Sequence, residues 1–245
     1  MQGSKSKIFF RIAAILLLAV FIVGVLCDLT YYILRNVNYS SYIWGSGSVF
    51  KQFSVTNLLN FITEMLPMIR STAGAVLALL AVIMLFAAKE KVAGRIIIIS
   101  AVITYVLYMT TMVIYIILRL EDKLALTEYL NANTWNMIKT TATSALVILF
   151  GLLLTGVFKN GSKVFGFILC GLFAAGILGT LFEFISAMPA FFKIFNQGDA
   201  FYKVAIIVAR IAQIMGCVRY TAYALCCLGV ALRPRESVKT EPEIS

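Results

Sequence analysis

Histidine is absent from this chain of 245 residues, and charged residues make up only 13% of it. The missing imidazole excludes His-based intramembrane protease dyads, most zinc enzymes, haem-binding bundles and His-dependent phosphatases. The sequence also lacks paired-glutamate protease motifs and nucleotide-binding loops. We therefore expect no catalytic residue, no metal site and no cofactor, and we predict that the protein is not an enzyme.

Cysteine spacing gives no sign of metal or redox chemistry. The chain has no C-x-x-C pair, and all five cysteines fall inside apolar blocks. Buried free cysteines behave as small apolar side chains. We expect packing roles for Cys27, Cys170, Cys217, Cys226 and Cys227.

Long apolar runs dominate what is present. The hydrophobic fraction is 61%, above the roughly one-half of ordinary soluble domains. These residues form blocks of about 20 or more, the length that crosses about 30 Å of hydrocarbon. We predict an all-α polytopic membrane protein, a single domain of six transmembrane helices at 8–34, 67–88, 92–118, 135–158, 164–187 and 204–232. A polar cytoplasmic tail is expected at 233–245.

The net charge of +10 does not indicate a nucleic-acid partner, because the basic residues flank the apolar blocks. The short connections at 89–91 and 159–163 are basic, and so are both termini. Short basic loops stay in the cytoplasm. We predict a multi-pass protein of the plasma membrane with both termini cytoplasmic, and compactness without targeting extensions favours a bacterial source.

Two local patterns give further expectations. Residues 55–66 have the apolar spacing of a helix that ends before Pro67, which predicts a short surface helix separate from the second span. Glycines crowd the fourth and fifth spans, and Gly171 and Ala175 have the spacing that lets helices approach closely. We predict tight packing between these two spans.

A short signature occurs three times, in the second helix of each expected hairpin. It is a basic residue followed, after one position, by Thr-Ala, and it reads Arg70-Ser71-Thr72-Ala73, Lys139-Thr140-Thr141-Ala142 and Arg219-Tyr220-Thr221-Ala222. The pattern suggests three pseudo-repeated helical hairpins around an axis normal to the membrane. Chance similarity between apolar sequences is the alternative.

Charged residues inside the spans are the candidate functional groups, because each is unfavourable by about 2.5 kcal/mol or more at the membrane centre. In one interpretation their side chains extend to the interface and pair there. In the other, the basic and acidic groups converge on a cavity. Arg219 is the deepest, since it lies fourteen residues before Arg233, or about 21 Å along a helix. The candidate substrate-binding residues are Asp28, Arg70, Lys139, Glu183 and Arg219, with the hydroxyls of Thr72, Thr141 and Thr221.

Three cations against two carboxylates would favour a negative group. The sequence thus predicts transport of a small anionic or zwitterionic solute, with the lipid bilayer and that solute as partners. The alternative is a non-transporting membrane scaffold or accessory subunit that acts through a partner protein or a second copy of the chain. A polar cavity joining the three basic residues would favour transport, and a closed apolar core with those residues facing lipid headgroups would favour the scaffold.

Overall fold

The computed structural model describes residues 2–43, 55–120, 122–158, 162–197 and 200–233, so the predicted tail at 234–245 lies outside the described residues. Within these ranges all regular structure is helical. The helices are α1 (Gln2–Ile43), α2 (Val55–Phe86), α3 (Glu90–Ile117), α4 (Lys123–Thr155), α5 (Ser162–Ser186), α6 (Met188–Gln197) and α7 (Ala200–Ala231).

Six segments of the described chain are long and apolar enough to cross a membrane. They are Lys7–Thr30, Met65–Phe86, Glu90–Ile117, Lys123–Thr155, Ser162–Lys193 and Lys203–Ala231. The number and order of the apolar helices therefore agree with the sequence prediction, and they are consistent with an integral membrane protein.

Helix α2 corrects the prediction of a separate surface helix. It runs without interruption from Val55 to Phe86 and carries Pro67 inside it. Proline removes one backbone hydrogen bond and crowds the preceding turn. Long apolar helices nevertheless continue through proline where neighbouring groups satisfy the freed carbonyl. A short helix does occur at another place in the chain. It is α6, which connects α5 to α7.

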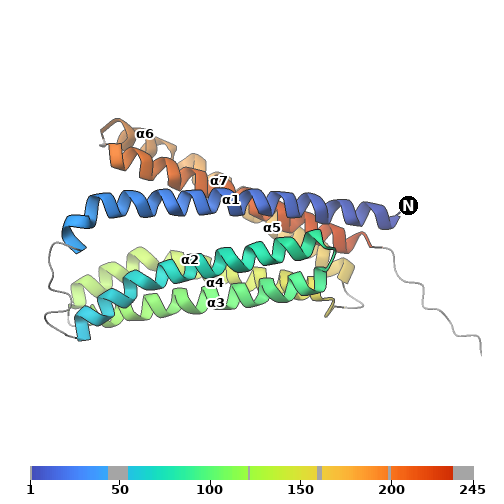
Figure 1. The fold of residues 1–245 in the computed structure, drawn as a ribbon, viewed down its shortest axis with the longest axis horizontal. Coiled ribbons are helices and arrows are strands. Elements are labelled where there is room, and N and C mark those ends of the chain that lie inside the picture. Colours follow the sequence, from blue (N-terminus) through green and yellow to red (C-terminus); the bar gives the residue numbers. More distant parts are fainter. Residues whose placement is uncertain (1, 44–54, 121, 159–161, 198–199, 234–245) are drawn as a thin grey trace, which may run out of the picture.

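The long helices form two layers, one of α1, α7 and α5 and the other of α2, α3 and α4 (Figure 1). Within each layer the neighbours are antiparallel and the middle helix, α7 or α3, packs against both others. The first expected hairpin is divided between the layers, since α1 packs more extensively on α7 than on α2. The threefold repeat stays a prediction.

Glycines set the close contacts within the layers. A Cβ atom at Gly94 of α3 would lie 2.6 Å from the carbonyl oxygen of Gly151 in α4, and one at Gly166 of α5 would lie 2.9 Å from the carbonyl oxygen of Cys227 in α7. Gly171, in contrast, has no atom within 4 Å of the position its Cβ would take. The predicted packing of the fourth and fifth spans is wrong, because Gly151 of α4 faces α3, Gly166 of α5 faces α7, and α4 and α5 touch only sparsely.

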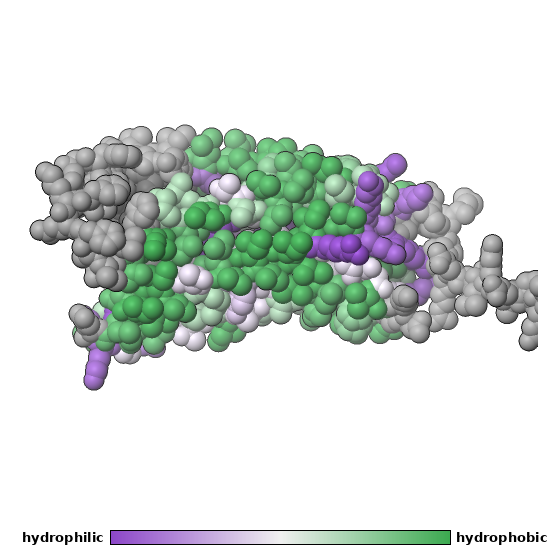
Figure 2. Space-filling view, turned by 60° about the horizontal axis from the view of Figure 1, so that its bottom comes forward, coloured by the Kyte–Doolittle hydropathy of each residue, from purple (hydrophilic) through white to green (hydrophobic). Residues whose placement is uncertain are grey.

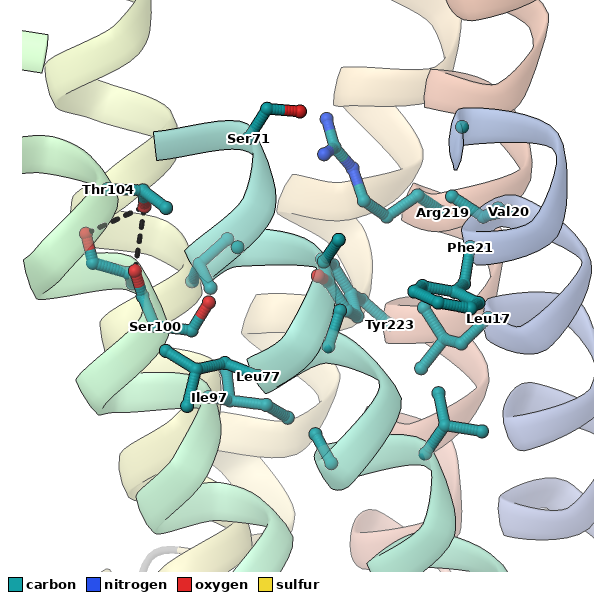
Figure 3. A pocket seen from close by; sticks show the side chains of 18 of the residues that line it. Leu17, Val20, Phe21, Ser71, Leu77, Ile97, Ser100, Thr104, Arg219 and Tyr223 are labelled. Carbon is teal, nitrogen blue, oxygen red and sulfur yellow. Dashed lines mark hydrogen bonds between the residues drawn. The ribbon is translucent and has the colours of Figure 1, made fainter. Parts of the chain in front are cut away.

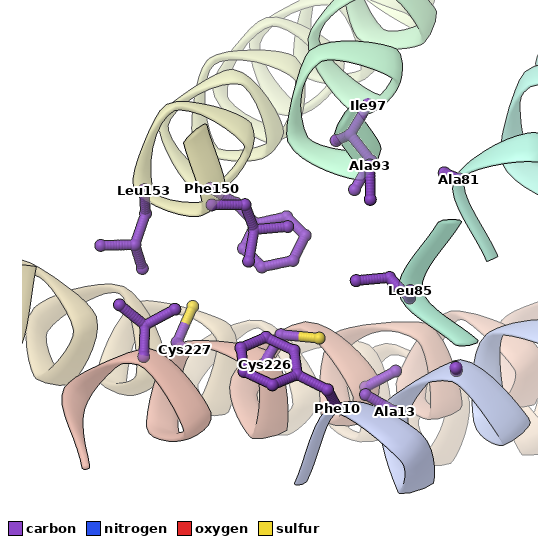
Figure 4. Close-up of a cluster of buried hydrophobic side chains, with 14 of the residues drawn as sticks. Phe10, Ala13, Ala81, Leu85, Ala93, Ile97, Phe150, Leu153, Cys226 and Cys227 are labelled. Carbon is purple, nitrogen blue, oxygen red and sulfur yellow. The ribbon is translucent and has the colours of Figure 1, made fainter. Parts of the chain in front are cut away.

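The hydrophobic core lies at one end of the molecule, which we call the basic end. This end holds the first turns of α1, the α2–α3 connection and Arg233. Each of the six long helices contributes to the core, and Figure 4 shows the side chains from α1, α2, α3, α4 and α7. Representative buried side chains are Phe10, Leu85, Ile97, Phe150, Phe173 and Cys226. The two layers are therefore held together at the basic end.

Aromatic contacts and one ion pair complete this closure. The Phe150 ring lies 5.8 Å from Phe173, edge to face, and 4.8 Å from Tyr223. Nη2 of Arg233 lies 3.0 Å from Oε1 of Glu90, and the guanidinium lies 5.0 Å from the centre of the Phe10 ring. Arg233 thus connects the end of α7 to both α3 and α1.

The outer surface is mostly apolar. Figure 2 shows a broad hydrophobic flank, with hydrophilic side chains gathered toward one end. Many large apolar side chains are exposed, among them Leu178 at 68% and Phe182 at 73%. A surface of this kind is unfavourable in water and is suited to contact with lipid chains.

The glycine contact between α3 and α4 yields a stability prediction. Gly151→Leu places new atoms against Ile98 and the backbone of Gly94, so we expect the free energy of unfolding to fall by about 1–3 kcal/mol. Gly171→Leu is the matched control, because it makes the same change in helix propensity where nothing is displaced. Thermal unfolding in detergent measures both variants, and equal stabilities would contradict the packing described.

Candidate functional site: a cavity between the layers

A cavity of about 390 Å³ separates the two layers next to the core (Figure 3). Helices α1 and α7 line one side, and α2, α3 and α4 line the other. Chain direction orders the lining residues by depth. Helices α1 and α3 run away from the basic end, whereas α2, α4 and α7 run toward it. The end of the cavity nearest the core is called the floor. The end farthest from the basic end is called the rim.

The floor is apolar. Its side chains include Leu17 of α1, Leu77 of α2 and Ile97 of α3, which Figure 3 shows together, and Val147 of α4. Ala81 and Ile97 also belong to the buried core, so the cavity ends directly on the closed contact between the layers. No charged residue lies among these floor positions.

The rim carries both charged residues of the cavity, Asp28 of α1 and Arg219 of α7. The Ser71 hydroxyl of α2 donates a hydrogen bond to Oδ2 of Asp28 and so connects the two layers. Arg219 extends across the cavity toward Ser71 in Figure 3. All three residues are exposed, which indicates that the cavity is open at the rim.

Arg219 has no carboxylate partner among the described residues. Its guanidinium carbon lies 5.8 Å from the centre of the neighbouring Tyr220 ring. A guanidinium offers five N–H donors, and a cation without a counter-ion in an apolar bundle is unfavourable. The side chain is therefore available to an anionic group that enters the cavity.

Hydroxyl groups of α3 and α4 also line the cavity. They belong to Ser100, Thr104, Thr143 and Ser144. Thr104 donates to the carbonyls of Ser100 and Ala101 at 2.7 and 3.2 Å, as drawn in Figure 3. The hydroxyls of Ser100, Thr143 and Ser144 make no hydrogen bond within the described part of the chain, so they can donate to or accept from a ligand.

Three other predicted site residues lie away from the cavity lining. The Arg70 guanidinium carbon lies 5.6 Å from the ring centre of Tyr108, between α2 and α3. Nζ of Lys139 lies 2.6 Å from Oε1 of Glu183 and joins α4 to α5. These two side chains are 45% and 40% exposed. Of the five predicted charged residues, the cavity therefore contains Asp28 and Arg219 only, while Lys139 and Glu183 pair with each other outside it. The cavity does not join the three basic residues, which the transport interpretation expected it to do.

The threonines of the signature do not line the cavity either. Thr141 and Thr221 donate hydrogen bonds to the carbonyls of Met137 and Cys217, one turn earlier, at 2.8 and 2.9 Å. This is the local bonding common for threonine in apolar helices. Thr72 is exposed. A role in substrate binding stays a prediction for all three.

The sequence interpretation missed the hydroxyl wall and Ser71. A signal for α3 was present, because Ser100 and Thr104 are four residues apart, which places two hydroxyls on one helix face in a long apolar run. The adjacent pair Thr143 and Ser144 interrupts the apolar run of α4. Ser71 stood inside the signature, beside the threonine that the prediction chose.

Comparisons with protein-family models, curated proteins and solved structures find no match for this chain. The chemistry of the cavity therefore carries the functional argument. It combines a cation and a carboxylate at the rim, free hydroxyls on the facing wall and an apolar floor. Such a site can hold a small polar molecule by ionic and hydrogen bonds.

The Lys139–Glu183 contact yields a test of its structural role. The charge reversal Lys139→Glu should lower stability, because it places two carboxylates together between α4 and α5. Adding Glu183→Lys should restore most of the loss. We expect a coupling of about 0.2–1 kcal/mol, as for other exposed ion pairs. A double-mutant cycle of thermal unfolding measures the coupling, and strictly additive effects would rule out this pairing.

Proposed function

We propose that the protein transports a small anionic or zwitterionic solute across a membrane by way of the cavity between its layers. The observation that carries the proposal is the unpaired Arg219 in that cavity. A charge in an apolar bundle is retained where it has a task, and such residues commonly mark the path of a solute.

The arrangement of the layers supplies a way to alternate access. The layers are closed at the basic end and hold an open cavity beyond it. Membrane transporters often move solute by rocking two helix groups about a central site. In this protein the inward movement would part the core contacts around Phe150 and break the Arg233–Glu90 ion pair. The basic end, as the cytoplasmic side, would then open while the rim closes.

The scaffold alternative has one observation in its favour. Gly171 and Gly179 of α5 have no atom within 4 Å of a built Cβ, so this face has room for a helix of another chain. Small residues permit close helix contact in membranes. A scaffold would need neither Arg219 nor an open cavity. Variants that remove Arg219 or fill the cavity therefore distinguish the two proposals.

Uptake into proteoliposomes tests the transport proposal. The probes are radiolabelled lactate and succinate as anions, and glycine and leucine as zwitterions. We expect at least one probe to accumulate above protein-free liposomes. We also expect Arg219→Gln to reduce that uptake about tenfold or more, since a hydrogen bond to a charged group contributes about 1.5–3 kcal/mol. Lys139→Gln removes a cation outside the cavity and should leave uptake nearly normal. Uptake of no probe, or equal uptake by wild type and Arg219→Gln, would contradict transport.

A second variant blocks the cavity and leaves its charges in place. Gly24 lines the cavity, and its Cβ position meets no atom within 4 Å. Gly24→Leu should therefore fill the space without disturbing packing and should abolish uptake at unchanged stability. Gly171→Leu makes the same change where there is space outside the cavity and should transport as the wild type does. Normal uptake by Gly24→Leu would exclude this route for the solute.

A further inference from the structure

We infer that the solute is a compact amphipathic zwitterion, whose carboxylate binds Arg219, whose cationic group binds Asp28 and whose apolar group points to the cavity floor. The inference rests on the proposed function and narrows it to one chemical class. It follows from how the charges, hydroxyls and apolar side chains are distributed in depth.

The two charges are of opposite sign and share one rim, yet no ion pair joins them within the described ranges. Asp28 accepts a hydrogen bond from Ser71, and a carboxylate has about four acceptor positions. It can therefore also accept bonds from an ammonium group. The guanidinium of Arg219 can donate two parallel bonds to a carboxylate. One zwitterion satisfies both groups, whereas a simple anion leaves Asp28 as a repulsive charge beside it.

The depth order fixes the orientation of the solute. Asp28 is eleven residues farther along α1 than Leu17, or about 16 Å along the helix axis. On α7 the order is reversed, as the chain direction requires, so Arg219 lies at the rim and Tyr223 lies closer to the core. Rim charges and floor side chains are thus separated along the cavity. An apolar group on a solute bound at the rim would point down the cavity toward Phe21, which Figure 3 shows below Arg219.

The volume of the cavity limits the size of the solute. About 390 Å³ lies at the low end of the roughly 300–1,000 Å³ of small-molecule pockets. An amino acid with a branched or aromatic side chain has the required charges and a suitable size. The headgroup of a zwitterionic phospholipid has the same charge pattern, but its two chains exceed this volume.

Binding to the purified full-length protein tests the inference with four probes. Leucine carries both charges and an apolar group. Glycine lacks the apolar group, 4-methylpentanoate lacks the ammonium group, and 3-methylbutylamine lacks the carboxylate. Isothermal titration calorimetry in detergent should show leucine binding at least about tenfold more tightly than each of the others.

Two single variants should shift this preference in opposite directions. Asp28→Asn removes the repulsion toward an anion, so 4-methylpentanoate should bind as well as leucine or better. Arg219→Gln removes the carboxylate partner, so leucine should lose about tenfold or more while 3-methylbutylamine is little affected. Gly171→Leu is the control and should bind all four probes as the wild type does.

Several results would overturn the inference. They are binding of none of the probes, equal binding of leucine and glycine, and identical effects of Asp28→Asn and Arg219→Gln. Tighter binding of dihexanoyl phosphatidylethanolamine than of leucine would assign the site to a lipid headgroup and overturn the small solute. Failure of the transport proposal looks different, because leucine would then bind as described and would not enter proteoliposomes.

Discussion

The packing of six helix ends around Phe150 is the contact on which the rest of the structure depends. Every long helix places a buried side chain there, and glycines at Gly94, Gly151 and Gly166 bring the backbones close enough to do so. Lipid chains are as apolar as leucine, so close packing rather than exclusion of water holds such helices together. Beyond this contact the Ser71–Asp28 hydrogen bond and the Lys139–Glu183 ion pair bridge the layers, which leave the cavity between them.

The charged side chains within the long helices have different surroundings at helix contacts and at the cavity. Where helices meet, basic side chains find local partners, as Lys139 does in Glu183 and Arg70 in the Tyr108 ring. Where the layers part, Arg219 and Asp28 face open space and keep their charges unpaired with each other. One signature in three helices therefore produces three environments. The functional difference comes from the position of each copy relative to the core, and not from the signature itself.

Much of the fold was predictable, because block length and hydropathy specify apolar helices almost without regard to neighbours. The depth of Arg219 in the membrane stays a prediction, which rests on counting residues along one helix. Which helices share a layer was not predictable. Gly151 and Gly171 each place a small residue on a helix face, and the sequence does not show which of them packs against a neighbouring helix. The continuous α2 was missed since a proline rule from soluble helices was applied to an apolar one. Ser71 and the hydroxyls of α3 and α4 required the pairing of layers before they could be recognised as one wall.

The central claim is a cavity that opens away from the basic end and is closed toward it. Thiol labelling in vesicles of known orientation tests this most directly, with the wild-type labelling of the native cysteines subtracted. A membrane-impermeant maleimide, added on the side opposite the basic end, should modify Ser71→Cys at the rim. It should not modify Leu85→Cys, which is 2% exposed in the core, from either side. An unreactive Ser71→Cys, or a Leu85→Cys that reacts readily from the basic side, would contradict the account.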